Sequence, residues 1–402
     1  MTGSRDAGWR NRPGLLVGLC VLVYLPFCLL GYGNDIDVAN VLRAGRSSIE
    51  DGDYQMSRGP GAAIHEVATA GLDRVGGSVL VDLASVAFAA LTLWCAYRLV
   101  DRDRGRWPAF ALLLIGANPW FWIAATSLGD FVWALGLLLA GAVAAQADRR
   151  VVAGVLFGLA VGCRASTAVL VVAWLVAEAW PVGGSSRPRW REVAVTGAVA
   201  VAVGIACFVP PWLDAGRTLD FLDNELDFAG LRVHLGRWVV KNLAVVGLLV
   251  GVVLLVGFPR WIAALRRWRS SPVVRFAVFM VVACELLFLR FPFKPLHLLP
   301  VVAGLALFVA SSERATQTWL TALVAAQLVG GVVGVTLARP DVPDDAATGR
   351  VQVSVVAGPL VTDVRCRLDD RERGTWPPAA AFEATLRAGA NAACLNETWR
   401  GE

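Results

Sequence analysis

The sequence predicts an all-α integral membrane protein with about eleven transmembrane helices and a small extracytoplasmic C-terminal tail. Of its 402 residues, 56% are hydrophobic, and the mean hydropathy of +0.59 lies far outside the range of soluble domains. Apolar runs of about 20 residues, the length that spans hydrocarbon, recur along the chain. Arginines cluster in the short segments between these runs, as they do in the loops of multi-pass proteins.

Two of the predicted spans need a specific argument. The first apolar run, 14–33, is not followed by a small-residue cleavage site, so it is predicted to be a retained span rather than a signal peptide. The run from 151 to 181 is too long for one crossing, and we divide it at Arg164 because an arginine in hydrocarbon costs at least about 2.5 kcal/mol. Arg164 is therefore predicted at a turn. The predicted spans are 14–33, 79–100, 107–125, 128–147, 151–164, 166–181, 192–212, 239–258, 273–291, 295–311 and 318–338.

The distribution of positive residues predicts the orientation in the cell membrane. Lys and Arg concentrate in cytoplasmic loops, and every second connection of this chain, beginning with the N-terminus, is rich in arginine. The N-terminus is therefore predicted to be cytoplasmic, and an odd number of spans puts the C-terminus on the extracytoplasmic side. Because topology already explains the formal net charge of +5, membrane lipids are expected partners and no nucleic-acid partner is predicted.

The chain divides into a polytopic transmembrane domain, 1–338, and a small extracytoplasmic tail, 339–402. The tail opens with a linker rich in Pro, Asp and Gly and continues with a β-like run and then a helix-like run. Cys366 and Cys394 lie in this oxidising-side segment and are predicted to form a disulfide. The other cysteines lie in or beside apolar runs and are predicted to be small buried side chains.

The first outer loop, 34–78, is polar, acidic and rich in turn-forming residues. Asp35 and Asp37 lie two residues apart, so an extended backbone would point both carboxylates to one side, whereas a helix that begins at Asp37 would make that residue an N-cap. In one interpretation the aspartates only cap an interfacial helix. In the other, one carboxylate is a general base that takes the proton from an acceptor hydroxyl. The same pair is a candidate ligand set for a divalent cation.

Further along this loop, Arg58 lies in a turn-rich stretch, 57–61, whose glycines leave room for the close approach of a ligand. A planar guanidinium there suits a phosphate, and the alternative is an arginine that snorkels to lipid headgroups. His65, beside Glu66, is either a substrate contact or a hydrogen-bonded residue at the start of a helix. No P-loop, nucleophile elbow or dinucleotide fingerprint is present, so nothing predicts the chemistry of soluble nucleotide enzymes.

Other ionisable residues lie at the outer ends of later spans. Asp130 is at the outer end of the fourth span, and Glu285 lies within the ninth, where a buried charge is costly and usually functional. The stretch from Arg290 through Lys294 to His297 puts two cations and a histidine in a proline-rich turn on the same face as the first loop. The alternative is that Glu285 and Arg290 only neutralise one another.

This order of features resembles the GT-C superfamily of membrane glycosyltransferases, notably the dolichyl- or polyprenyl-phosphate-sugar-dependent relatives of protein mannosyltransferases and of lipid A aminoarabinose transferases. The resemblance extends over most of residues 14–338. It rests on the following motifs: Asn34-Asp35-Ile36-Asp37, Gly52-Asp53-Tyr54, Ser57-Arg58-Gly59-Pro60-Gly61, Asn118-Pro119 followed by Asp130, Ala153-Gly154 with Gly158 and Arg164, and Arg290 with Lys294-Pro295 before Leu298-Leu299-Pro300.

The resemblance implies an inverting transfer of a sugar from a lipid-linked donor to an acceptor glycan, lipid or protein at the outer face. By position, Asp37 or Asp35 would be the base. The implied contacts of the donor phosphate and substrates are Arg58, Asp130, Arg164, Arg290, Lys294, His65 and His297.

Two other classes of function compete with this one. A transporter or flippase of a lipid-linked or anionic substrate would also place charged residues within the membrane. The sequence has no internal repeat of the kind that secondary transporters usually show, which counts against that class. A third interpretation is a non-catalytic assembly partner that docks through its outer loops and tail.

Overall fold

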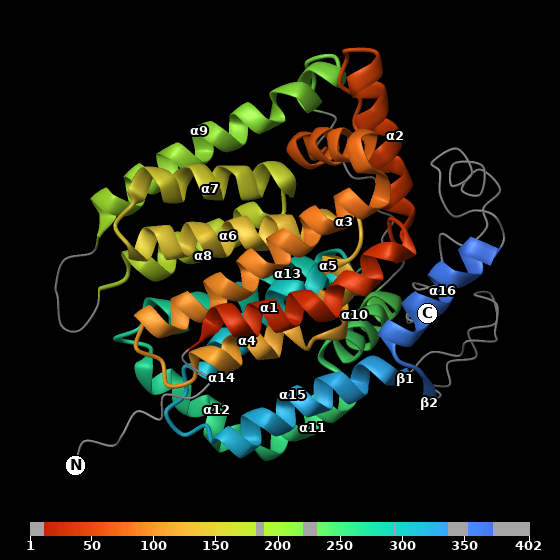
Figure 1. The fold of residues 1–402 in the computed structure, drawn as a ribbon. Coiled ribbons are helices and arrows are strands. Elements are labelled where there is room, and N and C mark those ends of the chain that lie inside the picture. Colours follow the sequence, from red (N-terminus) through yellow and green to blue (C-terminus); the bar gives the residue numbers. More distant parts are fainter. Residues whose placement is uncertain (1–11, 182–188, 220–230, 293, 337–352, 373–402) are drawn as a thin grey trace.

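The computed structural model describes residues 12–181, 189–219, 231–292, 294–336 and 353–372, and this part of the chain is almost entirely helical (Figure 1). The elements in chain order, with 3-10 helices written η, are α1 (Pro13–Tyr24), η2 (Leu25–Leu30), α2 (Ile36–Glu50), α3 (Ala63–Arg102), α4 (Pro108–Gly116), α5 (Pro119–Ala125), α6 (Asp130–Gln146), α7 (Arg150–Cys163), α8 (Thr167–Ala179), α9 (Trp190–Asp214), α10 (Leu231–Val246), α11 (Leu248–Val256), α12 (Phe258–Trp261), η4 (Ile262–Arg267), α13 (Pro272–Arg290), η5 (Pro295–Leu298), α14 (Leu299–Ala310), α15 (Gln317–Val332), β1 (Val333–Thr336), β2 (Ser354–Ala357) and α16 (Pro359–Glu372).

The apolar segments of the structure match the predicted spans one for one. Among the described residues, 4 helices are long and apolar enough to cross a membrane, and up to 6 spans result if each of 2 sharply bent helix pairs counts as one. Shorter apolar helices account for the remaining predicted spans. The predicted turn at Arg164 is confirmed, because α7 ends at Cys163 and Arg164 is its C-cap.

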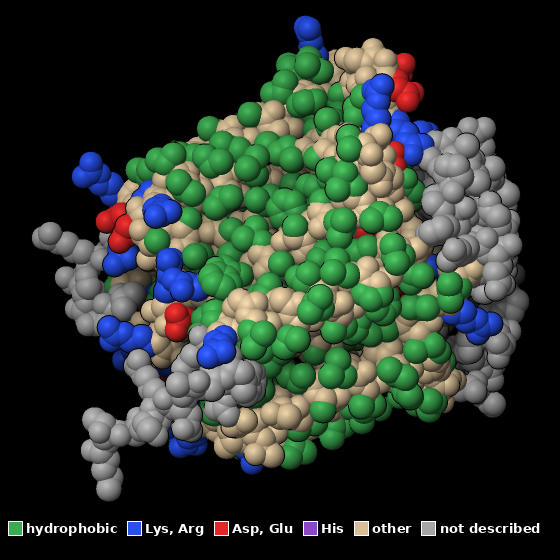
Figure 2. Space-filling view, in the orientation of Figure 1, with side chains coloured by type: hydrophobic (Ala, Val, Ile, Leu, Met, Phe, Trp, Pro, Cys, Tyr) green, Lys and Arg blue, Asp and Glu red, His purple; other side chains and the backbone are tan. Residues whose placement is uncertain are grey.

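The surface supports a membrane environment. In Figure 2, hydrophobic side chains form a continuous band across the visible face, and charged side chains gather toward its ends. Several of the largest aliphatic side chains are more than half exposed, including Leu22, Val201, Ile205, Leu255 and Leu286. Such exposure fits contact with lipid rather than with water. The chain is therefore a membrane protein.

Helix α3 has 40 residues, about twice the length that hydrocarbon requires. It is interrupted at Gly76 and Gly77, and the φ of 62° at Gly77 is a left-handed value that favours glycine. The segment before this break belongs to the predicted outer loop, which therefore consists of α2, a connection and the first part of α3 rather than irregular chain. Figure 1 shows α2 and the tail elements β1, β2 and α16 at the same end of the bundle.

A row of glycines brings α7 into close contact with α9. Gly154, Gly158 and Gly162 recur every fourth residue, and a Cβ atom at each would lie only 2.5–2.6 Å from a side chain of α9. Small residues at this spacing allow two membrane helices to approach closely. The contact fixes the end of α7, which carries Arg164.

The last predicted span, 318–338, is wrong at its C-terminal end. Helix α15 ends at Val332, and strand β1 follows at once and pairs antiparallel with β2, so that Val333 lies opposite Ala357. Two glycines followed by β-branched residues weaken the helix here, and the partner strand satisfies the backbone. The β-like run predicted in the tail is confirmed at β2 but is wrong at its end, where the residues from Pro359 onward belong to α16. The helix-like run predicted after it lies outside the described residues.

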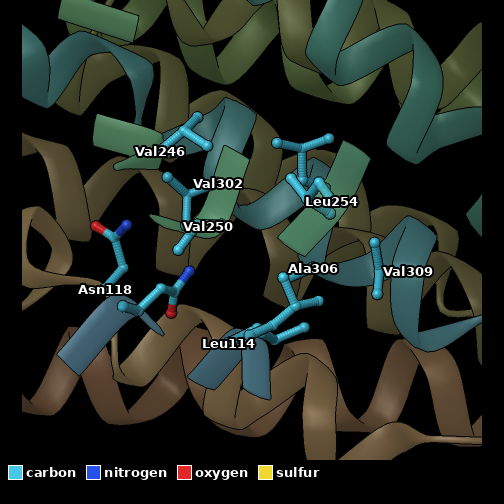
Figure 3. A pocket seen from close by; sticks show the side chains of 11 residues that line it. Leu114, Asn118, Val246, Val250, Leu254, Val302, Ala306 and Val309 are labelled. Atoms are coloured by element: carbon cyan, nitrogen blue, oxygen red, sulfur yellow. The ribbon is translucent and has the colours of Figure 1, made fainter. Parts of the chain in front are cut away.

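The interior also holds a small cavity between α4, α11, α14 and α15 (Figure 3). Its volume is about 30 Å³, and it is lined by aliphatic side chains apart from Asn118 and Gln327. Asn118 caps α5 and donates to Val245 O at 2.9 Å, so its amide has a structural role. A cavity of this size holds about one water molecule and cannot hold a sugar.

Candidate functional site

Six of the residues singled out in the sequence form one continuous network of ion pairs at the end of the bundle that carries α2. Lys294 Nζ lies 2.6 Å from both Asp35 Oδ1 and Asp37 Oδ2. Arg58 contacts Asp37 and, through Nη2, lies 2.8 Å from Asp130 Oδ2. Arg164 Nη1 lies 2.7 Å from the other oxygen of Asp130. Three carboxylates thus balance three cations drawn from four separate parts of the chain.

The two aspartates of the first loop have different structural roles. Asp35 has an extended backbone and is the N-cap of α2, and its Oδ1 accepts a hydrogen bond of 2.9 Å from the backbone N–H of Asp37. The alternative in which Asp37 caps the helix is therefore wrong, because α2 begins at Ile36 and Asp37 lies in its first turn. Asp37 Oδ1 makes no hydrogen bond to a described residue, and the side chain is 26% exposed.

Contacts with α3 hold α2 in place. Arg46 donates through Nε to Asp73 Oδ2 at 2.8 Å, and Tyr32 donates to the other oxygen of the same carboxylate. Where the helices cross, a Cβ atom at Gly45 would lie 2.4 Å from Glu66 O, so only glycine permits this approach. The second half of α2 is therefore fixed to the outer part of α3, and this positions the helix whose first turn carries Asp37.

Glu66 anchors the connection that carries Arg58. Its buried carboxylate accepts hydrogen bonds from the Tyr54 hydroxyl and from both the hydroxyl and the backbone N–H of Ser57, the latter at 3.2 Å. At Met56, the backbone N–H donates to Asp214 Oδ2 of α9 at 3.0 Å. In the sequence, Glu66 stands out only as a neighbour of His65. No spacing in the sequence indicates that it reaches back to Ser57.

Asp130 and Arg164 come from the facing ends of α6 and α7. Asp130 is the first residue of α6 and its side chain is only 4% exposed, which makes it the most buried member of the network. The guanidinium of Arg164 lies 4.1 Å from the centroid of the Phe131 ring, a cation–π distance. A buried carboxylate that binds two arginines fixes their guanidinium groups relative to one another.

Lys294 reaches the network from the proline-rich turn after α13. Pro295 begins η5 directly after it, and Lys241 of α10 donates to Pro292 O at 2.8 Å, which holds the turn against the bundle. The Lys294 side chain is 14% exposed. Its ammonium is thus recessed but remains accessible to a solute.

The charges of the network alter the titration of its members. Burial opposes ionisation of Asp37, but Arg58 and Lys294 outweigh it and hold the pKa of the Asp37 carboxyl below its usual value. Burial also disfavours the cation of Arg58, yet Asp130 and Asp37 raise the pKa of its guanidinium. Asp37 and Arg58 are therefore both charged at neutral pH.

His65 and His297 lie beside the network without joining its ion pairs. His65 is 1% exposed, its ring stands edge to face with Trp133 at 5.2 Å, and neither ring nitrogen hydrogen-bonds to a described residue. His297 lies 5.5 Å from the Phe131 ring, centroid to centroid. Asp130, Arg58 and Arg164 act electrostatically on both rings. The two histidines thus border the group of charges on the side of α6.

Arg290 is not brought to this network. Its exposed guanidinium lies 4.8 Å from the centroid of the Phe291 ring, and it makes no ion pair within the described part of the chain. The alternative in which it neutralises Glu285 is also wrong, because Glu285 Oε2 instead accepts hydrogen bonds from Trp238 at 2.8 Å and Asn242 at 3.2 Å.

The aspartates of the first loop do not fit a divalent cation as they stand. Both carboxylates are already in contact with the Lys294 ammonium, which supplies a fixed positive charge where the metal would bind. Oxygen ligands from several carboxylates or carbonyls are needed to hold such a cation, and the described residues contain no group of three or more His, Cys, Asp or Glu suited to a metal ion.

In the tail, Cys366 of α16 is buried and disulfide-bonded. Cys394 lies outside the described residues, so its predicted pairing with Cys366 stays a prediction. The six cysteines of the apolar segments are free thiols; four of them are buried, as predicted, whereas Cys20 and Cys207 are partly exposed.

The arrangement of the helices is that of a polytopic membrane protein with the GT-C type of fold. Its solved structural neighbours include ArnT from Cupriavidus metallidurans. The crystal structure of ArnT bound to undecaprenyl phosphate matches with a TM-score of 0.59 and 16% identity, over 98% of this chain and 79% of ArnT. The apo state matches with a TM-score of 0.57 and 18% identity, over 96% of this chain and 76% of ArnT.

No protein-family model matches the chain, and no curated protein matches it by sequence. The similarity to ArnT is therefore a similarity of fold, and it confirms the predicted fold class.

Proposed function

We propose that this chain is a membrane glycosyltransferase that transfers a sugar from a polyprenyl-phosphate-linked donor to an acceptor hydroxyl on the extracytoplasmic face. The network of three carboxylates and three cations at one end of a GT-C bundle carries the proposal. Such a transfer needs cations where negative charge grows on the leaving group and a carboxylate near the attacking hydroxyl. Both sets meet in this network. ArnT, which has the same fold, binds undecaprenyl phosphate in its crystal structure.

The three cations Arg58, Arg164 and Lys294 are the proposed contacts of the donor phosphate. As the bond between the sugar and the phosphate breaks, a diester monoanion becomes a monoester dianion, so cations fixed beside it stabilise the leaving group more than the donor. Arginine offers a planar pair of N–H donors that matches phosphate oxygens. Asp130 keeps its arginines in place for this role because it is the most buried member.

Asp37 is the proposed general base, since its Oδ1 is free of hydrogen bonds to described residues and its side chain is the more exposed of the two first-loop carboxylates. In the donor-free chain its cations make it a weak base. A phosphate that draws Arg58 and Lys294 toward itself removes part of this stabilisation and raises the basicity of Asp37. Donor binding therefore prepares the base that receives the proton of the acceptor hydroxyl. His65 and His297 remain proposed substrate contacts at the border of the site.

Reconstitution into liposomes with a polyprenyl-phosphate sugar, followed by quantification of released polyprenyl phosphate, tests this function. The proposal predicts release coupled to the appearance of a glycosylated acceptor. A transporter would move the lipid-linked substrate across the bilayer without releasing polyprenyl phosphate, and that result would contradict the proposal. In the host, deletion should remove a glycan and cause the polyprenyl-phosphate sugar to accumulate.

A further inference from the structure

Arg367, from the tail helix α16, is buried between the tail and the transmembrane bundle. The residue is only 2% exposed, and its Nη1 donates a hydrogen bond of 2.7 Å to the backbone oxygen of Thr126. This hydrogen bond links the tail helix directly to the backbone of the bundle. Thr126 is the C-cap of α5.

Asp363 compensates the buried charge of Arg367. Asp363, one turn earlier in α16, lies 3.0 Å from Arg367 Nε. Asp82 of α3 is also fully buried near Arg367, and neither of its oxygens hydrogen-bonds to a described residue. A buried arginine without a counter-charge is strongly destabilising. The pair with Asp363 keeps the buried Arg367 charged, and the hydrogen bond to Thr126 O ties it, and with it α16, to the bundle.

The segment that Arg367 contacts joins α5 to α6 and delivers Asp130 to the candidate site. Its backbone is held at successive residues by three parts of the chain: Arg367 at Thr126 O (2.7 Å), Ser85 at Ser127 O (3.0 Å) and the Tyr32 carbonyl at Leu128 N (2.8 Å). Asp130 begins α6 immediately after these contacts. Its carboxylate then binds Arg58 and Arg164.

The tail docks closely enough to transmit this constraint. Helix α16 packs on η2, α5 and α15. At the start of α16, the Gly358 N–H donates to Val332 O at 2.8 Å, and a Cβ atom at Gly358 would lie 2.4 Å from Gly331 O. The turn between β2 and α16 is therefore pressed against the end of α15 with no space for a side chain.

We propose that Arg367 is a positioning residue of the candidate site: the tail helix fixes the backbone that delivers Asp130, and through Asp130 it fixes Arg58 and Arg164. Arg367 itself contacts neither the ion-pair network nor the proposed donor phosphate. The consequence for donor binding rests on the proposed function, whereas the link between Arg367 and the 126–130 segment is a property of the fold.

Arg367→Met removes the hydrogen bond to Thr126 while keeping a side chain of similar length, and Leu368→Met, at an exposed position of the same helix, is the control. The first measurement is hydrogen–deuterium exchange of the peptide that contains residues 126–130. Exchange is expected to be at least about tenfold faster in Arg367→Met and unchanged in Leu368→Met, because only Arg367→Met loses a hydrogen bond from a charged group. The second is binding of undecaprenyl phosphate in detergent, for which Kd is expected to rise by about fivefold or more.

Wild-type exchange in Arg367→Met would overturn the inference, and so would faster exchange with unchanged lipid binding. If Arg367→Met does not fold, the double variant Asp82→Asn/Arg367→Met is tested instead. Asp82→Asn removes the acidic group that would be left without its neighbouring cation, and the contact with Thr126 is still absent. The double variant is expected to exchange fast, and wild-type exchange in it would overturn the inference. A wild-type chain that does not bind the lipid contradicts the proposed function instead, and the exchange difference then decides the inference alone.

Discussion

Replacing Asp37 by asparagine keeps the shape of the side chain and its capacity to accept a hydrogen bond, but it removes the charge and the basicity. In the structure Asp37 contacts Arg58 and Lys294 through Oδ2, and its Oδ1 is free to meet an acceptor hydroxyl. Loss of a general base lowers turnover by roughly 10²–10⁴, which corresponds to an increase of about 2.7–5.4 kcal/mol in the activation barrier. Asp37→Asn is therefore expected to reduce turnover by that factor.

The assay is the release of polyprenyl phosphate per folded protein at saturating donor, together with a separate measurement of donor binding. Asp35→Asn is the matched control: Asp35 is the N-cap of α2, asparagine caps a helix about as well as aspartate, and only its contact with Lys294 weakens. We expect this control to keep turnover within about tenfold of the wild type. Wild-type turnover in a folded Asp37→Asn protein would refute Asp37 as the base.

Four further outcomes are expected. Arg164→Ala should weaken donor affinity at least about tenfold, because a charge-assisted bond in a recessed site is worth about 1.5–3 kcal/mol. The control Arg43→Ala, on the exposed face of α2, should leave donor affinity unchanged, and equal affinity in the two variants would argue against a phosphate site. The pKa of Asp37 lies below its usual 3.8, so the carboxylate and its ion pairs persist as the pH falls and are lost only at a pH below 3.8. The pH profile of kcat/KM should therefore show no acidic limb near neutral pH. Peptide mapping without reductant should recover Cys366 linked to Cys394, whose loop closure is worth about 3–4 kcal/mol; finding both as thiols rejects the pairing. A reporter fused to the C-terminus should be extracytoplasmic, and a cytoplasmic signal would contradict the predicted topology.

The fold was predictable because its main determinants are local in sequence. The length of each apolar run and the cost of an arginine in hydrocarbon locate the helices and the turn at Arg164. The end of α15 is not predictable from hydropathy, because residues 333–336 continue the apolar run of the helix before them. Only their pairing with β2 makes them a strand. Hydropathy also gives no sign that α3 continues outward beyond the membrane, since that depends on packing against α2.

The sequence predicts which residues belong to the candidate site, but it does not predict which of them contact one another. Charged residues at the outer ends of spans are rare enough to stand out, which is why Asp130 and Lys294 could be singled out. Arg290 and Lys294 lie in the same short stretch, and the sequence gives no reason to prefer one cation over the other as a partner of Asp37. The direction of each side chain in the folded chain decides that Lys294 contacts Asp37. The anchoring of Arg58 by Glu66 likewise depends on how the connection folds back on α3.

The central claim is that the donor phosphate binds the cations of this network, and an experimental structure of the chain with bound polyprenyl phosphate tests it most directly. The account predicts phosphate oxygens within hydrogen-bonding distance, about 3 Å, of at least two of Arg58, Arg164 and Lys294. It also predicts that Asp37 has lost at least one of its cation contacts. A phosphate bound elsewhere, for example at Arg290, with the contacts among Asp37, Arg58 and Lys294 unchanged, would contradict it.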